Sequence, residues 1–298
     1  MKKLIITADD FGPVKGINNG IYKAIEEKKI TSVASFVNFD DALNVINNAK
    51  LIFEPNSIEV GLHISITSGA PISDHALIPN LIGTDGLFYD VKKFPIQNVT
   101  RKEIKIELEA QYNKFIELYG YKPLHISNHH GILDLIPDIY ETYLEFCEEK
   151  NIPKRSARII PSFNKSLYYI FFVGPAFKAE FKGLYHFIRT MKDEDVINYY
   201  RNKYKKVKSP YYLDSRFFQI RNNKSLHHSL KKVEDNQTNE IMLHLFKGSV
   251  NESFNYTGIN KDYFNGRKKE LKYLLDSMFF ELIIKKPTKY ALGSWGDL

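Results

Sequence analysis

Acidic and imidazole side chains stand at or near the ends of several short apolar runs in this sequence. They are Asp9 and Asp10, His63, the pair His129 and His130, and His244. Carboxylate oxygens and imidazole nitrogens bind Zn²⁺ and related divalent ions, and they also serve as general acids and bases. A single buried histidine is more often a hydrogen-bonded core residue. The combination of Asp, His and His, rather than any one residue, therefore favours a site for a Zn²⁺-like divalent ion.

Two of these histidines lie in runs that read as strands with one apolar and one polar face. In the predicted strand Ile58–Ser65, the apolar residues alternate with His63, and in the predicted strand Ile241–Phe246 they alternate with His244. Active sites of α/β barrels lie at the carboxyl ends of the parallel strands. The position of both histidines therefore favours a functional role.

For each of the two adjacent pairs, Asp9 with Asp10 and His129 with His130, the question is which side chain faces the pocket. On an extended chain, Asp9 and Asp10 point to different sides, so one could bind a cation while the other does separate work. The alternative is that one of them caps the helix predicted to begin at Ile17. By the same alternation, at most one of His129 and His130 faces the pocket if the strand before them continues that far.

The elements that must position these residues follow a βα pattern, because runs rich in β-branched residues alternate with amphipathic stretches. The predicted strands are Lys3–Ala8, Ser32–Val37, Ile58–Ser65, Leu124–Asn128, Ala157–Ile160, Ile241–Phe246 and Tyr290–Gly293. The predicted helices are Ile17–Glu27, Asp41–Ala49, Arg101–Tyr119, Pro137–Lys150 and Tyr263–Phe280. No glycine-rich dinucleotide loop follows the first strand. The pattern predicts an α/β fold, a (β/α) TIM-like barrel that is distorted or incompletely closed.

We expect residues 1–298 to form one barrel domain, with a basic, aromatic-rich insertion or covering segment at about 162–237. The chain is 43% hydrophobic and 26% charged, as in soluble globular proteins. The apolar stretch Leu167–Phe181 is interrupted by Gly174 and Pro175 and is too short for a membrane span. Cys147 is the single cysteine, so no internal disulfide can form, and we expect a cytoplasmic protein.

The formal net charge is +7, and its excess is concentrated between Lys178 and Lys232, where cations such as Arg201 and Lys203 alternate with tyrosines. The first interpretation is a solvated helical face. The alternatives are a surface for an acidic or lipid-linked ligand, or for nucleic acid. Because the sequence contains no nucleic-acid-binding motif, we expect no nucleic-acid partner. A homo-oligomer is compatible with the sequence.

A series of motifs resembles the YdjC-like carbohydrate deacetylases, a family that includes chitooligosaccharide deacetylase. The matching segments are Thr7–Gly12, Gly61–Ile64 with Thr67, Gly69 and Pro71, Asp85–Phe88, Glu107 with Gln111, Pro123–Ile126 leading to His129, Arg158 before Pro161, Glu240–His244, and Arg267 with Glu270 and Leu271. Each motif is weak alone, but their order is specific. The resemblance covers nearly the whole chain except its basic middle.

The resemblance implies a (β/α) barrel enzyme that hydrolyses the acetamide of an N-acetylated amino sugar or oligosaccharide and releases acetate. It implies that Asp10, His63 and His129 bind a divalent metal ion, Zn²⁺ or Mg²⁺. It also implies that Asp9 is the general base and His244 the general acid. Two other readings stay open: a barrel metallohydrolase acting on phosphate esters, and a non-catalytic carbohydrate-binding relative.

The sequence departs from the family pattern at two places. Ser127 and Gly131 stand where the family usually has an aspartate and a histidine, and Leu245–Gly248 replaces the family's Pro-Gly after His244. Residues around metal ligands tune metal affinity by about 10–100-fold. The departures therefore bear on substrate choice and rate.

Overall fold

The structure is a computed structural model, and it describes residues 1–91, 93–94, 98–158, 185–186, 188–190, 193–214, 236–251, 261–276 and 289–298. Most of the predicted covering segment at 162–237 lies outside these residues. The chain forms two compact units, the first made of Met1–Phe36, Asp41–Gly61 and Pro210–Leu298, and the second of Val37–Asp40 and Leu62–Ser209. That residues 1–298 form one barrel domain remains a prediction.

The strands form a seven-stranded sheet in the order β4-β3-β2-β1-β6-β5, with β7 also paired to β1. Their bounds are β1 Lys2–Phe11, β2 Ser32–Ser35, β3 Glu59–Ile64, β4 Ile126–Asn128, β5 Leu213–Asp214, β6 Thr238–Leu243 and β7 Tyr290–Leu292. The strand pairs with a described register are all parallel. Parallel neighbours need long crossovers, which the helices provide. The α/β class and the parallel sheet of an incompletely closed (β/α) barrel are confirmed.

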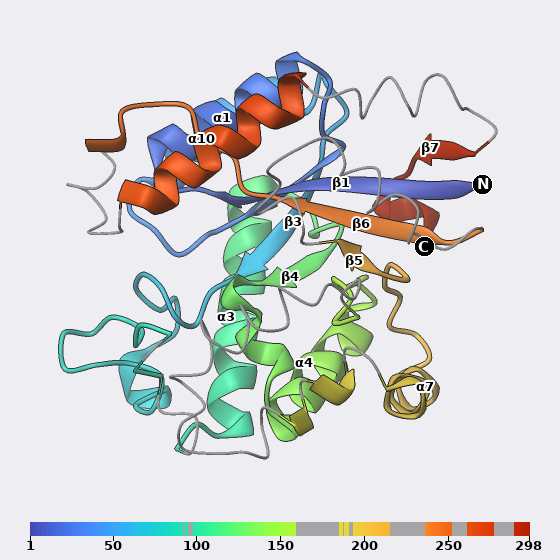
Figure 1. Cartoon of the computed structure of the whole chain (residues 1–298). Coiled ribbons are helices and arrows are strands. Elements are labelled where there is room, and N and C mark those ends of the chain that lie inside the picture. The colour runs from blue at the N-terminus through green and yellow to red at the C-terminus, as the bar shows by residue number, and fades with distance from the viewer. Residues whose placement is uncertain are drawn as a thin grey trace. The chain divides into compact units, whose positions relative to one another are not determined.

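In the first unit, β1 is the central strand (Figure 1). Its residues Lys3–Ala8 pair with β6 along one edge, while on the other edge its start pairs with β7 and its end with β2. Its apolar side chains are fully buried. The helices of this unit are α1 Lys15–Glu26, α2 Ala42–Phe53 and α10 Lys261–Asp276, and the short turn η4 is Trp295–Asp297. Helices α1 and α10 lie side by side.

Close packing brings α1 against the segment that follows β6. A Cβ atom at Gly20 would lie 2.6 Å from the backbone nitrogen of Phe246, and Gly16 accepts a 2.7 Å hydrogen bond from the backbone N–H of Lys247. Glycine at these positions lets the helix approach the backbone directly. The segment carrying His244 is therefore held against α1.

In the second unit, strong local signals delimit the two long helices. Helix α3, Arg101–Tyr119, starts with a capping box between Thr100 and Glu103 and ends at Gly120 in the left-handed conformation. Helix α4, Pro137–Lys150, has proline in its first turn, and α3 and α4 are neighbours (Figure 1). Among the described residues of this unit, further helical elements are α7 Glu194–Lys203, η1 His75–Leu77 and η2 His129–Asp134.

The buried face of α3 also carries polar residues that hold the loop after β3. Glu107 accepts hydrogen bonds of 3.1 Å from the backbone N–H groups of both Ile72 and Ser73. Gln111 accepts from the backbone of Ser65 at 3.1 Å and donates back to it at 2.6 Å. These contacts satisfy the loop backbone and fix the carboxyl end of β3.

Several predicted bounds differ from the structure. Strand β6 ends at Leu243, before His244, because its ladder with β1 stops at the pair Ala8 and Leu243. The strand predicted at Ala157–Ile160 is wrong for its described part: the chain instead makes a parallel bridge between Lys154 and Ile126. Residues 159–160 and 277–280, the end of the last predicted helix, lie outside the described residues.

The helices in the described part of the chain include none that is long and apolar enough to cross a membrane.

Candidate metal centre

Asp10 lies where β1 loses its regular geometry. Its φ is 66°, in the left-handed region that aspartate tolerates better than most residues, and the register between β1 and β2 shifts between Ala8 and Phe11. Such an irregularity changes the direction of a side chain at the end of a strand. The alternation that the sequence suggested for the aspartate pair therefore does not extend to Asp10.

The alternative role of the aspartates as helix caps is excluded. Helix α1 begins at Lys15, its N-cap residue is Val14, and no side-chain hydrogen bond caps it. Instead, Asn18 of α1 accepts from the backbone N–H of Gly12 at 2.9 Å and donates to its carbonyl at 2.7 Å. The turn after Asp10 is thus fixed by Asn18 of the helix and not by an aspartate side chain.

Arg267 of α10 forms a buried ion pair with Asp10. Its guanidinium donates to Oδ2 of Asp10 at 2.5 Å, and the two side chains are 1% and 4% exposed. The same guanidinium contacts the hydroxyl of Tyr263 and lies 4.3 Å from the centre of its ring. This charge-assisted hydrogen bond fixes the orientation of the carboxylate.

Sequence reasoning assigned no role to Arg267, although a signal was available. The buried face of α10 consists of Phe264, Arg267, Glu270, Leu271 and Leu274. A charged residue within an apolar helical stripe is rarely buried without a partner. The ion pair with Asp10 is the reason for its place there.

His63 lies in β3 and is buried. Its register partner on the parallel strand β4 is Ser127, and the Nδ1 atom of His63 lies 2.7 Å from the hydroxyl oxygen of Ser127. This hydrogen bond fixes the plane of the ring and engages Nδ1, so Nε2 is the nitrogen suited to bind a metal. The family departure at Ser127 therefore directly contacts a candidate ligand.

His129 is the first residue after β4 and opens the turn η2. Asn128 holds this turn closed, since it accepts from the backbone of Leu133 at 3.1 Å and donates to Asp134 at 3.0 Å. The ring centroids of His63 and His129 are 5.4 Å apart. The turn, rather than a continued strand, sets the direction of His129.

The alternation expected of His129 and His130 required a strand that continues through them, and this condition is not met. The strand stops at Asn128, and His130 and Gly131 have φ values of 59° and 65°, so the alternation of an extended chain does not apply. The rings of His129 and His130 are 3.8 Å apart, and Nδ1 of His130 lies 2.9 Å from the hydroxyl of Thr67. The ring of His130 therefore packs against the ring of His129.

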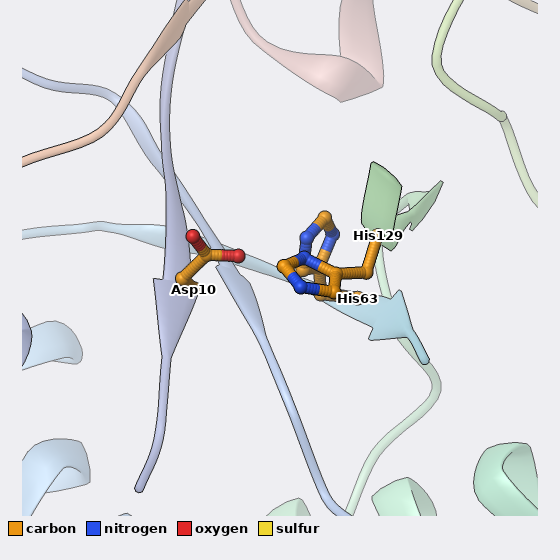
Figure 2. Close-up of side chains that lie close together, drawn as sticks. All are labelled: Asp10, His63 and His129. Carbon is orange, nitrogen blue, oxygen red and sulfur yellow. The ribbon is translucent and has the colours of Figure 1, made fainter. Parts of the chain in front are cut away.

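Asp10, His63 and His129 each offer one ligand atom, and these atoms all lie within 4.8 Å of one another. Figure 2 shows their side chains directed toward a common point. One carboxylate oxygen and two imidazole nitrogens are a donor set typical of Zn²⁺-like ions in sites that keep a coordination position open. Within the described residues, this group could hold a metal ion.

Asp9 and His244 do not belong to this group of three. Asp9 is 1% exposed, and His244 is half-buried directly after β6. The backbone N–H of His244 donates to Glu270 of α10 at 2.7 Å, in place of a sheet hydrogen bond. Helix α10 thus contacts the chain at both Asp10 and His244.

Comparison with known proteins agrees with this picture. The model of the YdjC-like protein family matches residues 3–285. A carbohydrate deacetylase of Clostridium beijerinckii is 32% identical over 158 residues, covering 53% of this chain and 61% of that protein. A chitooligosaccharide deacetylase of Proteus mirabilis is 34% identical over 163 residues, covering 53% and 60%. These matches therefore span only about three fifths of the relatives' own length.

Among solved structures, one from Enterococcus faecalis, whose proposed role is cellobiose-phosphate cleavage, superimposes with a TM-score of 0.78. The match covers 99% of this chain and 98% of that one at 20% sequence identity, so it shows a shared fold. The family match covers nearly the full sequence and includes all three candidate ligands. The chain belongs to the family of YdjC-like proteins.

Proposed function

We propose that this protein is a metal-dependent carbohydrate deacetylase that hydrolyses the acetamide of an N-acetylated amino sugar or oligosaccharide. The observation that carries the proposal is the convergence of Asp10, His63 and His129. Relatives named carbohydrate deacetylase and chitooligosaccharide deacetylase support the reaction and the substrate class.

The three residues fit a divalent cation such as Zn²⁺ or Mg²⁺. Ser127 engages Nδ1 of His63, which favours binding through Nε2, and Arg267 engages Oδ2 of Asp10, which favours binding through Oδ1. When bound, such an ion would polarise the acetyl carbonyl and lower the pKa of a water molecule toward about 7. Both are what amide hydrolysis lacks at neutral pH.

In this proposal, Asp9 and His244 transfer the protons. Asp9 accepts the proton of the attacking water as a new C–O bond forms at the acetyl carbon. His244 donates a proton to the sugar nitrogen as the C–N bond breaks, so that acetate and a free amino sugar leave. The fixed backbone of His244, bonded to Glu270, would hold the imidazole in place during this step.

The test is an acetate-release assay on N-acetylglucosamine and its oligomers, run with metal-free protein and after addition of Zn²⁺ or Mg²⁺. We expect activity only with metal. His63→Ala and His129→Ala should lose both bound metal and activity. Asp9→Asn and His244→Ala should keep the metal and lose about 10²–10⁴-fold in rate. Metal-dependent phosphatase activity without acetate release would contradict the proposal.

A further inference from the structure

The second unit contains a cavity whose lining includes none of the candidate metal ligands or proton-transfer residues. Its volume is about 50 Å³, and it is bounded by α4, by α7 and by the segment that follows the bridge at Lys154. A buried water needs about 10–15 Å³ on this scale, so the cavity has room for several waters or for one group with a few oxygens. Its contents must match the polar side chains that line it.

The lining is rich in hydrogen-bond donors and positive charge. Lys154, Ser156 and Arg158 line the cavity from one short segment of the chain, and Arg201 of α7 adds a third cation. Thr190 contributes a further hydroxyl. None of the described residues that line the cavity carries a carboxylate.

Lys154 is the decisive residue, because its ammonium is buried with only distant polar partners. The side chain is 3% exposed, and its Nζ lies 3.5 Å from Asp134 and 3.5 Å from the hydroxyl of Tyr140. Both distances are at the outer limit of a hydrogen bond. An ammonium has three N–H donors, and burying it without close acceptors is unfavourable.

Lys154 nevertheless stays charged. Burial alone lowers the pKa of an ammonium, but the neighbouring Tyr140 and Asp134 outweigh this effect and raise the pKa of Lys154 above its ordinary value. The rings of Tyr140 and Tyr143 lie 4.8 and 5.2 Å from Nζ, a geometry that favours a cation. Lys154 is therefore a cationic residue in the lining of the cavity.

Arg158 reinforces this arrangement. Its side chain is 9% exposed and contacts Glu194, a carboxylate that is itself 55% exposed and does not line the cavity. Asp134 and Glu194, the acidic partners of Lys154 and Arg158, are thus not among the residues that line the cavity, whereas the two cations are. The ligand that matches such a cavity is small, carries negative charge and offers only acceptor atoms.

We propose that this cavity binds a small oxyanion of the phosphate or sulfate type, held by Lys154 and Arg158 with help from the hydroxyls of Ser156 and Thr190. The anion is either free or the terminal group of a larger ligand. The proposal does not depend on the deacetylase function.

Isothermal titration of metal-free protein with sodium phosphate tests the proposal, with ionic strength held constant by NaCl. Metal-free protein is needed because phosphate also binds metal ions. We expect one saturable site per chain. Binding should persist in a His63→Ala/His129→Ala variant, which separates this site from the candidate metal centre. If the wild-type protein shows no saturable binding at up to tens of millimolar phosphate, the cavity holds only water and the proposal fails.

Variants then test the residues. Lys154→Met and Arg158→Gln should each weaken phosphate binding by about 10-fold or more, since each removes a charged donor. Lys203→Gln is the matched control, because Lys203 is an exposed cation of α7 that does not line the cavity. The affinity of this variant for phosphate should stay within about 2-fold of the wild-type value. Equal losses in Lys203→Gln and Arg158→Gln would mean general charge attraction and would overturn the proposal.

Thr190→Val covers the case in which Lys154→Met fails to fold. It changes one buried hydroxyl to a methyl group of the same shape and should weaken binding about 2–10-fold. An unchanged affinity in both Thr190→Val and Arg158→Gln would reject the site. A comparison of inorganic phosphate with N-acetylglucosamine 6-phosphate decides the source: tighter binding of the sugar phosphate identifies the anion as part of a larger ligand, and equal or weaker binding identifies it as free.

Discussion

At the scale of single residues, Ser127 is the feature that distinguishes the candidate metal centre from the family pattern. Histidine ligands usually donate their second ring N–H to a carboxylate, a backbone carbonyl or water, and a carboxylate raises the basicity of the ring most strongly. Here a neutral hydroxyl lies 2.7 Å from Nδ1 of His63. Ser127 thus orients the ring without adding negative charge, and we expect it to limit metal affinity.

Replacing Ser127 tests this expectation. Ser127→Asp should tighten metal binding, within the range of about 10–100-fold that such neighbours control, and Ser127→Ala should weaken it. The Kd for Zn²⁺ can be measured by competition with a chromogenic chelator. Ser127→Asn is the control, because it has the size of aspartate without the charge. If Ser127→Asp and Ser127→Asn bind Zn²⁺ equally, the charge at position 127 does not set the affinity for Zn²⁺.

At the scale of elements, two glycines in helices should respond to alanine in opposite ways. Glycine inside a helix costs about 1 kcal/mol relative to alanine. At Gly20 of α1, however, a Cβ atom would lie 2.6 Å from the backbone of Phe246, whereas at Gly266 of α10 it meets nothing within 4 Å. Comparing alanine substitutions at the two positions therefore measures the effect of the close approach of α1 to the segment after β6.

We therefore expect Gly20→Ala to lower the free energy of unfolding and Gly266→Ala to raise it by up to about 1 kcal/mol. Urea denaturation of the two variants beside the wild type measures both effects. The explanation of Gly20 as a close-packing residue would be wrong if both variants gained stability.

Helix α10 is also connected to the end of β1, through the ion pair between Arg267 and Asp10. Removing one partner of a buried ion pair leaves the other charge unpaired, at a cost of about 3–5 kcal/mol. Arg267→Met should lower the stability of the metal-free protein by this order. Added Zn²⁺ should reduce the loss, because the metal ion also compensates the charge of Asp10.

The double variant Asp10→Asn/Arg267→Met provides the control for this coupling. It contains neither charge, so its loss of stability should be smaller than the sum of the two single losses. Additive losses, measured by urea denaturation, would mean that the two side chains do not interact in solution.

At the scale of the whole molecule, the positive charge is partly balanced where the structure describes it. Within the basic region, Lys203 pairs with Glu141 at 2.8 Å, and Arg189 pairs with Asp193 at 2.7 Å. These pairs are solvent-exposed on at least one side, so each contributes little to stability. They agree with the first interpretation of this region as a solvated face at these positions.

The stability of the molecule should also depend on pH through His186. Burial lowers the pKa of His186 to about 4, and its ring contacts Tyr140 and Tyr200. In the unfolded chain the pKa is about 6.5. As the pH falls from about 6.5 toward 4, the unfolded state takes up a proton that the folded state does not, so stability decreases over this window.

A histidine replacement should reduce this dependence. Urea midpoints of the wild type at pH 7 and pH 5 should differ more than those of His186→Phe, which keeps an aromatic ring but cannot be protonated. Carboxylates contribute equally to both proteins and cancel in the comparison. An equal pH effect in both proteins would show that His186 is protonated as readily in the folded state as in the unfolded one.

The sequence by itself determined the elements whose limits depend on neighbouring residues. The predicted bounds of α3 and α4 agree with the structure, because Thr100, Glu103, Gly120 and Pro137 act within one helical turn of the ends they set. Period-two and period-3.6 patterns also identified the parallel α/β sheet. The residue types of the candidate metal ligands were evident for the same reason, since donor chemistry belongs to the side chain alone.

Only the tertiary structure decided how those ligands are held. Arg267 is 257 residues from Asp10, and Ser127 is 64 residues from His63, so the local sequence identifies neither partner. The direction of His130 depends on where β4 stops, and that of Asp10 on an irregular register between β1 and β2. These side-chain directions and long-range contacts follow from strand register and packing. Register and packing depend on the whole fold, so the spacing of residues along the chain does not specify them.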